Sequence, residues 1–155
     1  MIRLQDSIRI RTTPGHIFKW LESMPSEYCA WHPDHVACRV LHGSMFQAGS
    51  EIKCQEFLHG KLHTMRLRPR RIDPGRCVEY EIAGLGGGFF EVVPEGEEVD
   101  FIAGLALGSD FPVLGQLVDV VLRSFFGRRL EAMRQHMREE GWNLKQILES
   151  GWNPS

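Results

Sequence analysis

A histidine and a glutamate stand one helical turn apart near the C-terminal end of the chain, in the segment MRQHMREEGW that contains His136 and Glu140. At about 100° per residue, both fall on the apolar side of the predicted helix, together with Met133 and Leu144. The neighbouring Glu139 projects away from that side. Neutral imidazole and carboxylate are ligands of Zn²⁺ and other divalent first-row metals, so this pair could form half of a metal site.

A second inward carboxylate is predicted on a strand near the middle of the chain. An unpaired carboxylate costs several kcal/mol to bury, so an inward Glu140 needs a partner from the sheet. In the strand EIKCQEFL, alternation puts Cys54 and Glu56 on the more apolar face. If residues 59–60 form a two-residue turn, His63 lies opposite Glu56. His63 is therefore a further candidate for the same site.

Two more histidines, His32 and His35, lie in the segment YCAWHPDH, just before the second predicted strand begins. Histidines and glutamates that converge from three separate segments have the composition of a metal site. The alternative is structural: His136 and Glu140 could form a buried pair, bonded to each other or to Arg129, which the same projection places inward.

Alternation and helical periodicity predict the elements that position these side chains. The predicted order is a strand, two short helices or turns, about six strands and a long helix, at residues 4–11, 13–23, 25–31, 35–110 and 113–148. One of the turns between strands is expected at 84–88, and the long helix has a possible break at Gly141. Its apolar stripe includes Val118, Leu122 and Phe125.

This order predicts a single α+β domain that spans residues 1–155. It is the order of the helix-grip fold, in which a curved, seven-stranded antiparallel sheet wraps around the C-terminal helix. Two short helices follow the first strand of that fold, and an internal cavity lies between the sheet and the long helix.

The composition excludes several classes of partner. With 43% apolar residues, 25% charged residues and a net charge of −2, the chain has no global charge that favours nucleic acid or a membrane. The basic run at 66–76 alternates, which places its arginines on a solvated strand face. The N-terminal segment lacks a signal-peptide run and no segment approaches ~20 apolar residues, so a cytoplasmic location is expected. The four cysteines lack CxxC spacing and fit reduced thiols.

Two segments resemble START-like and polyketide cyclase-like domains of the SRPBCC superfamily, which have the helix-grip fold. IRIRTTPGHIFKWLESM is similar to their first strand and Pro-initiated helix, and RRIDPGRCVEYEI is similar to their central hairpin. The segments WHPDH, CQEFLHG and HMREE further resemble the diacetylphloroglucinol hydrolase and phloretin hydrolase branch, whose zinc is held by two histidines and two glutamates. This resemblance implies four zinc ligands: His32, Glu56, His136 and Glu140. It covers the cavity domain only, because the chain is shorter than those hydrolases.

The resemblance also implies an activity. In that branch a polar residue three positions after the first zinc histidine contacts the substrate, and the matching residue here is His35, which could act as a general acid or base. His32 and His35 could also exchange roles. The expected reaction is hydrolysis of a small hydrophobic carbonyl compound, such as an acyl-phenol or β-diketone, with carbon–carbon bond cleavage and with His35 or His63 carrying the proton.

Six residues are expected to line the ligand cavity: Tyr28, Cys54, Met65, Tyr80, Phe101 and Met133. The expected partner is a small hydrophobic molecule bound by a monomer or a homodimer. Two other functions remain open at this point: a carrier or sensor that binds such a molecule without chemistry, and a polyketide cyclase-like protein.

Overall fold

The computed structural model describes residues 2–108 and 114–154, and for residues 114–128 it describes the backbone alone. The strands are β1 (Ile2–Ile10), β2 (His35–His42), β3 (Glu51–Leu58), β4 (Lys61–Asp73), β5 (Cys77–Ile82), β6 (Gly86–Glu95) and β7 (Glu98–Leu107). The helices are α1 (Pro14–Glu22), α2 (Met24–Trp31) and α3 (Leu114–Glu149). The predicted order of elements is confirmed. The predicted stripe residues Val118, Leu122 and Phe125 lie outside the side chains described.

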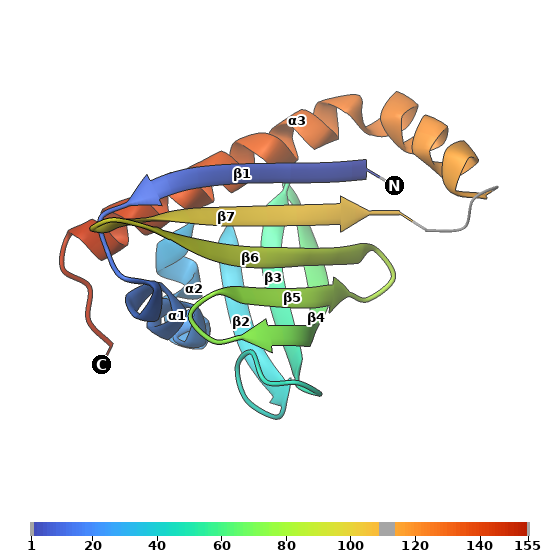
Figure 1. The fold of residues 1–155 in the computed structure, drawn as a ribbon. Helices are drawn as coiled ribbons and strands as arrows, with labels where there is room; N and C mark the ends of the chain where they lie inside the picture. The colour runs from blue at the N-terminus through green and yellow to red at the C-terminus, as the bar shows by residue number, and fades with distance from the viewer. Residues whose placement is uncertain (1, 109–113, 155) are drawn as a thin grey trace.

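The seven strands form one antiparallel sheet in the order β1-β7-β6-β5-β4-β3-β2. The sheet is strongly curved, so that β2, β3 and β4 run steeply to β1 and β7 (Figure 1). Helix α3 runs alongside β1, and α1 and α2 lie at the end of the sheet where α3 finishes (Figure 1). This is the predicted α+β helix-grip arrangement. Among the described residues, no helix is long and apolar enough to cross a membrane.

The two short helices form where the sequence supplies helix-starting residues. The Thr13 side chain accepts a hydrogen bond from the His16 backbone N–H at 3.3 Å, and Pro14 occupies the first helical turn. Ser23 ends α1 and precedes α2 directly. After α2 the chain makes a tight turn in which the His35 N–H donates to the His32 carbonyl at 3.0 Å. The two histidines therefore lie at the two ends of this turn, next to the start of β2.

Two glycine segments differ from the predictions made for them. Helix α3 continues through Gly141 without a break. A Cβ atom built there would lie 3.5 Å from the Ile8 side chain, an ordinary contact distance, so α3 passes close to β1 at this residue without requiring a glycine. The predicted turn at 84–88 is shorter than expected, because Gly86, Gly87 and Gly88 belong to β6. Strand alternation was hidden there because three glycines carry no hydrophobic pattern.

The space between α3 and the sheet is mostly filled by side chains. Tyr28, Cys54, Tyr80 and Phe101 are buried in the main core, and Met65 packs against it. A small cavity of about 10 Å³, close to the size of one water, is lined in part by Phe101 and Glu140. A separate groove of about 550 Å³ crosses β1, β7, β6 and β5 and includes Tyr80. The small cavity beside Phe101 and Glu140 is therefore far below the size of a ligand site.

Candidate metal centre

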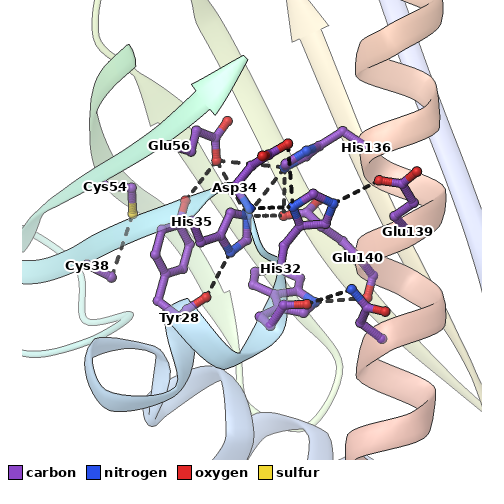
Figure 2. A network of polar contacts seen from close by, with 12 residues as sticks. Tyr28, His32, Asp34, His35, Cys38, Cys54, Glu56, His136, Glu139 and Glu140 are labelled. Atoms are coloured by element: carbon purple, nitrogen blue, oxygen red, sulfur yellow. Dashed lines mark hydrogen bonds and ion pairs between the residues drawn. The ribbon is translucent and has the colours of Figure 1, made fainter. Parts of the chain in front are cut away.

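Four titratable side chains from three elements meet in the interior beside α3 (Figure 2). His35 and Glu56 are direct partners in the pairing of β2 with β3, so their side chains lie on the same face of the sheet. His136 and Glu140 lie one turn apart on α3 and face them. His35, Glu56 and His136 are buried, and the Glu140 side chain is 18% exposed.

The nitrogen and oxygen atoms of this group are spaced like the ligands of a tetrahedral metal. His35 Nε2 lies 3.3 Å from His136 Nε2, 3.0 Å from Glu140 Oε1 and 3.6 Å from Glu56 Oε2. His136 Nε2 lies 3.6 Å from Glu140 Oε1 and 4.0 Å from Glu56 Oε2. Ligand bonds of 2.0–2.1 Å around a tetrahedral Zn²⁺ place the ligand atoms roughly 3.3–3.4 Å apart. These four residues could therefore hold a divalent cation with small side-chain adjustments.

The His35 ring has a fixed orientation and protonation state. Its Nδ1 lies 2.9 Å from the Tyr28 carbonyl oxygen, which can only accept, so Nδ1 carries the proton. Burial lowers the pKa of His35 to about 4, so the ring is neutral near pH 7. The Nε2 lone pair consequently points at His136 and Glu140. A backbone carbonyl that fixes the tautomer in this way is the usual support of a metal-binding histidine.

Burial also shifts the pKa values of the other three residues of the site. Burial raises the pKa of Glu140 to about 7, and it lowers the pKa of His136. Burial and the neighbouring Glu140 carboxylate raise the pKa of Glu56. The two carboxylates share a buried site with the His35 lone pair, so when both are ionised a proton or a cation has to compensate their charge. A divalent cation would compensate both carboxylates at once.

Tyr28 supports two members of the site, a role the sequence analysis missed by assigning it only to the cavity lining. Its hydroxyl donates to Glu56 Oε2 at 2.8 Å, and its backbone carbonyl accepts from His35. The Tyr28 and His35 rings also stack, with centroids 3.9 Å apart and planes 8° apart. One signal was available in the sequence: Tyr28 lies seven residues before His35, in the helix directly ahead of the predicted ligands.

His32 lies beside the site but is engaged elsewhere. Its Nδ1 accepts from the Asp34 backbone N–H at 3.1 Å, so Nε2 carries the proton and donates to Glu139 Oε2 at 2.9 Å. The ring centroids of His32 and His136 are 4.1 Å apart. His32, His35 and His136 each offer a nitrogen within 4.8 Å of the others, so a three-histidine set is a second possibility. The geometry favours His35 over His32 as the ligand, because His35 Nε2 faces His136 and Glu140, whereas His32 Nε2 is bonded to the exposed Glu139.

Glu139 is a functional candidate that helical projection missed. The projection places it away from the sheet, and its side chain is 46% exposed, yet its carboxylate reaches His32. Hydrogen bonds from Gln135 and His32 lower the pKa of Glu139. Glu139 therefore stays ionised beside His32, while its neighbour Glu140 faces the centre.

The structure does not bring His63 into this group. The predicted turn at residues 59–60 forms, and His63 pairs with Glu56 as expected. However, the His63 side chain is exposed, and among the described residues nothing connects it to the cluster. The first four residues of β4 are all exposed, so the correct face still leaves His63 in solvent, whereas its partner Glu56 is covered by Tyr28 and His35. Arg129, predicted to face inward, is also exposed.

The remaining predicted cavity residues lie around the site in the core. Cys54 is two residues before Glu56 on the same face of β3. Met65 is opposite Cys54 on β4, and Met133 packs with the smaller cluster formed by Ile2, Leu4 and Met137. Trp31 adds a link between helices, because its indole N–H donates to the Glu140 carbonyl at 2.9 Å.

Solved structures with the same architecture are numerous, although the sequences differ. A protein from Thermus thermophilus has a TM-score of 0.71 at 14% identity, covering 97% of this chain and 100% of that one. A polyketide cyclase-like protein from Corynebacterium glutamicum has a TM-score of 0.61 at 17% identity, covering 95% and 91%. A START superfamily protein from Mycobacterium smegmatis has a TM-score of 0.58 at 12% identity, covering 88% and 97%.

No family model matches the sequence, and no curated protein matches it either. The structural likeness extends over nearly the whole chain, from β1 through the end of α3. It includes proteins described as START and as polyketide cyclase-like, in agreement with the segments that resemble them. The chain therefore has the helix-grip fold of START-like and polyketide cyclase-like proteins.

Proposed function

We propose that this chain is a metal-dependent hydrolase, with zinc as the metal, that cleaves the carbon–carbon bond beside the carbonyl of a small hydrophobic ketone such as an acyl-phenol. The observation that carries the proposal is the group His35, Glu56, His136 and Glu140, in which the two histidine Nε2 atoms lie 3.3 Å apart and 3.0–4.0 Å from the two carboxylates. The resemblance to diacetylphloroglucinol hydrolase supplies the reaction class.

In this proposal the four side chains hold the cation and Tyr28 orients two of them. When bound, zinc would polarise the ketone oxygen and lower the pKa of a coordinated water toward neutrality. Tyr28 keeps the Glu56 carboxylate and the His35 lone pair aimed at the centre through its hydroxyl and its carbonyl. Trp31 holds α2 against α3 at Glu140.

Hydrolysis also needs a proton for the carbon that leaves. Water adds its oxygen to the carbonyl carbon, the carbon–carbon bond breaks, and the departing ring carbon takes up a proton. Because this proposal uses His35 as a metal ligand, it takes His32 as the proton carrier. Its Nε2–H is held by Glu139, and its ring lies 4.1 Å from that of His136. This assignment uses the exchange of roles between His32 and His35 that the sequence left open.

The experiment is an assay of the purified protein against a panel of acyl-phenols, before and after removal of the metal with a chelator. We expect release of the carboxylic acid and the deacylated phenol, loss of activity after chelation, and recovery when Zn²⁺ is returned. His32→Gln should reduce turnover and leave the metal bound, whereas His136→Gln should lose both. Activity that persists in metal-free protein would contradict the proposal.

A second candidate function is binding of a hydrophobic ligand without chemistry. The groove of about 550 Å³ across β1, β7, β6 and β5 favours it, because it has the volume of a small-molecule site and lies apart from the four ligand atoms. The START and polyketide cyclase-like neighbours support a ligand-binding fold in general. Binding of acyl-phenols to protein in which His136→Gln has abolished the metal site would favour this candidate.

A further inference from the structure

Two cysteines lie side by side next to the candidate metal centre (Figure 2). Cys38 on β2 and Cys54 on β3 are direct partners in the antiparallel pairing, and their sulfur atoms are 3.6 Å apart. Both are buried, and both are free thiols. Residues directly opposite each other in an antiparallel pair have Cα atoms roughly 4.5–5.5 Å apart, which is within the range of a disulfide. Only the two sulfurs need to approach, by about 1.5 Å, to reach bonding distance.

We propose that Cys38 and Cys54 form a reversible disulfide that clamps β2 onto β3 beside the candidate metal centre. The disulfide itself follows from the position of the two thiols. Its effect on metal retention rests on the proposed function. In a reducing compartment the pair stays as two thiols, and the bond forms when a peroxide is present.

The oxidation balances with hydrogen peroxide as the oxidant. The Cys54 thiol donates a hydrogen bond to Cys38, which lowers the pKa of the Cys38 thiol and makes it the attacking sulfur. Cys38 attacks the peroxide oxygen and becomes a sulfenic acid as the first water leaves. Cys54 then attacks the Cys38 sulfur and displaces the second water. The two thiols give up two electrons and two protons in total, and one peroxide becomes two waters.

The position of the pair explains why such a bond would matter to the site. Strand β2 lies at the edge of the sheet, and its pairing with β3 is irregular on both sides of Cys38. The first irregularity separates Cys38 from His35. An edge strand with broken pairing is the part of a sheet that opens most easily. A covalent link between Cys38 and Cys54 would hold the strand that carries His35 against the strand that carries Glu56.

The test uses a Cys29→Ser, Cys77→Ser variant, in which Cys38 and Cys54 are the only thiols. The folded variant is treated with hydrogen peroxide, and its intact mass is measured before and after reduction with dithiothreitol. We expect a loss of two hydrogen atoms that dithiothreitol reverses. The same background with Cys54→Ser should show no such loss. The oxidised protein should also have a higher Tm, and it should release Zn²⁺ to a chelator more slowly than the reduced protein.

Two results would overturn the disulfide, and a third would overturn its effect on the metal. The first is two thiols that stay free after peroxide treatment of the folded protein. The second is a gain of oxygen without the loss of two hydrogens. A disulfide that forms in metal-loaded protein without slowing the release of Zn²⁺ would contradict the clamp. The mass measurement decides the disulfide even in a protein that binds no metal, so failure of the proposed function would be seen separately.

Discussion

His35 Nε2 and Glu140 Oε1 lie 3.0 Å apart in a buried site, and near pH 7 each is an acceptor once Glu140 is ionised. Two acceptors at this distance need a proton or a cation between them. His136 and Glu56 face the same point, so a cation there would contact all four groups, whereas a proton on Glu140 would neutralise that carboxylate alone. At the scale of single residues, this is the physical reason to expect a divalent cation.

Tyr28→Phe tests whether the Tyr28 hydroxyl orients Glu56 for metal binding. The variant removes the hydrogen bond to Glu56 and leaves the ring stacked on His35. We expect the affinity for Zn²⁺ to fall by roughly 10–100-fold, the usual effect of losing a group that orients a metal ligand. Competition with a chelating dye measures this affinity. Tyr80→Phe, which also removes a buried tyrosine hydroxyl, is the control, and equal losses in the two variants would argue against a specific role for Tyr28.

The raised pKa of Glu140 predicts how the stability of the metal-free protein depends on pH. Its pKa is about 7 in the folded protein and 4.5 ordinarily, so between these values the folded state holds a proton that the unfolded state has released. The contribution of Glu140 to the free energy of unfolding therefore falls by up to about 3 kcal/mol as the pH rises from 4.5 to 7.

The lowered pKa of His35 acts in the opposite direction. The folded state binds fewer protons than the unfolded state between pH 4 and 6.5, so this group adds stability as the pH rises. The contribution of Glu140 is isolated by comparison with Glu140→Gln. Relative to wild type, the variant should gain stability between pH 4.5 and 7 in urea unfolding with chelator present. If the free energies of unfolding of wild type and Glu140→Gln change with pH in parallel, Glu140 does not titrate in this range.

At the scale of elements, α3 passes close to β1 at Gly141, but this contact has room for a small side chain. A Cβ atom there would lie 3.5 Å from Ile8 and 3.6 Å from Asp6, which are ordinary contact distances. Because alanine favours a helix interior over glycine by about 1 kcal/mol, Gly141→Ala should stabilise the protein by up to that amount. Gly88→Ala should destabilise it, since its Cβ would lie 2.5 Å from the Tyr80 hydroxyl. Thermal unfolding measures both effects. A lower Tm for Gly141→Ala would show that the contact between α3 and β1 does not tolerate a methyl group.

Sequence periodicity was sufficient to predict most of these elements and three members of the site. Alternation on β3 placed Glu56 inward, and helical projection separated Glu140 from Glu139 and placed His136 beside it. These predictions succeed because side-chain direction inside a regular element follows directly from its period. The structure confirms the inward face predicted for β3 and the inward face predicted for α3.

The parts that could not be predicted lie where a period gives no information. His32 and His35 flank a turn, in which no repeat fixes side-chain direction, so the choice between them needed the hydrogen bonds to Tyr28 and Asp34. For His63, the period gave the correct face but not the point at which the sheet extends into solvent. The cysteine pair was equally hidden, because the partner of Cys54 depends on the register between strands.

At the scale of the whole molecule, the helix-grip fold brings the start of β2, the end of β3 and the C-terminal half of α3 to one place. The seven-stranded sheet curves so that its last strands, β2 and β3, face α3 although β1 is the strand packed most closely on that helix (Figure 1). The fold is shared with proteins described as START superfamily and as polyketide cyclase-like, and a fold alone does not determine a function, so function has to be argued from the site.

Metal content tests the central claim most directly. Elemental analysis of the purified wild-type protein should find close to one zinc per chain, and Glu140→Gln should lose it. Glu139→Gln, a change of the neighbouring carboxylate that bonds His32 instead of the centre, should keep it. A folded wild-type protein that binds no divalent metal, or a Glu140→Gln variant that binds it as well as wild type, would contradict the account.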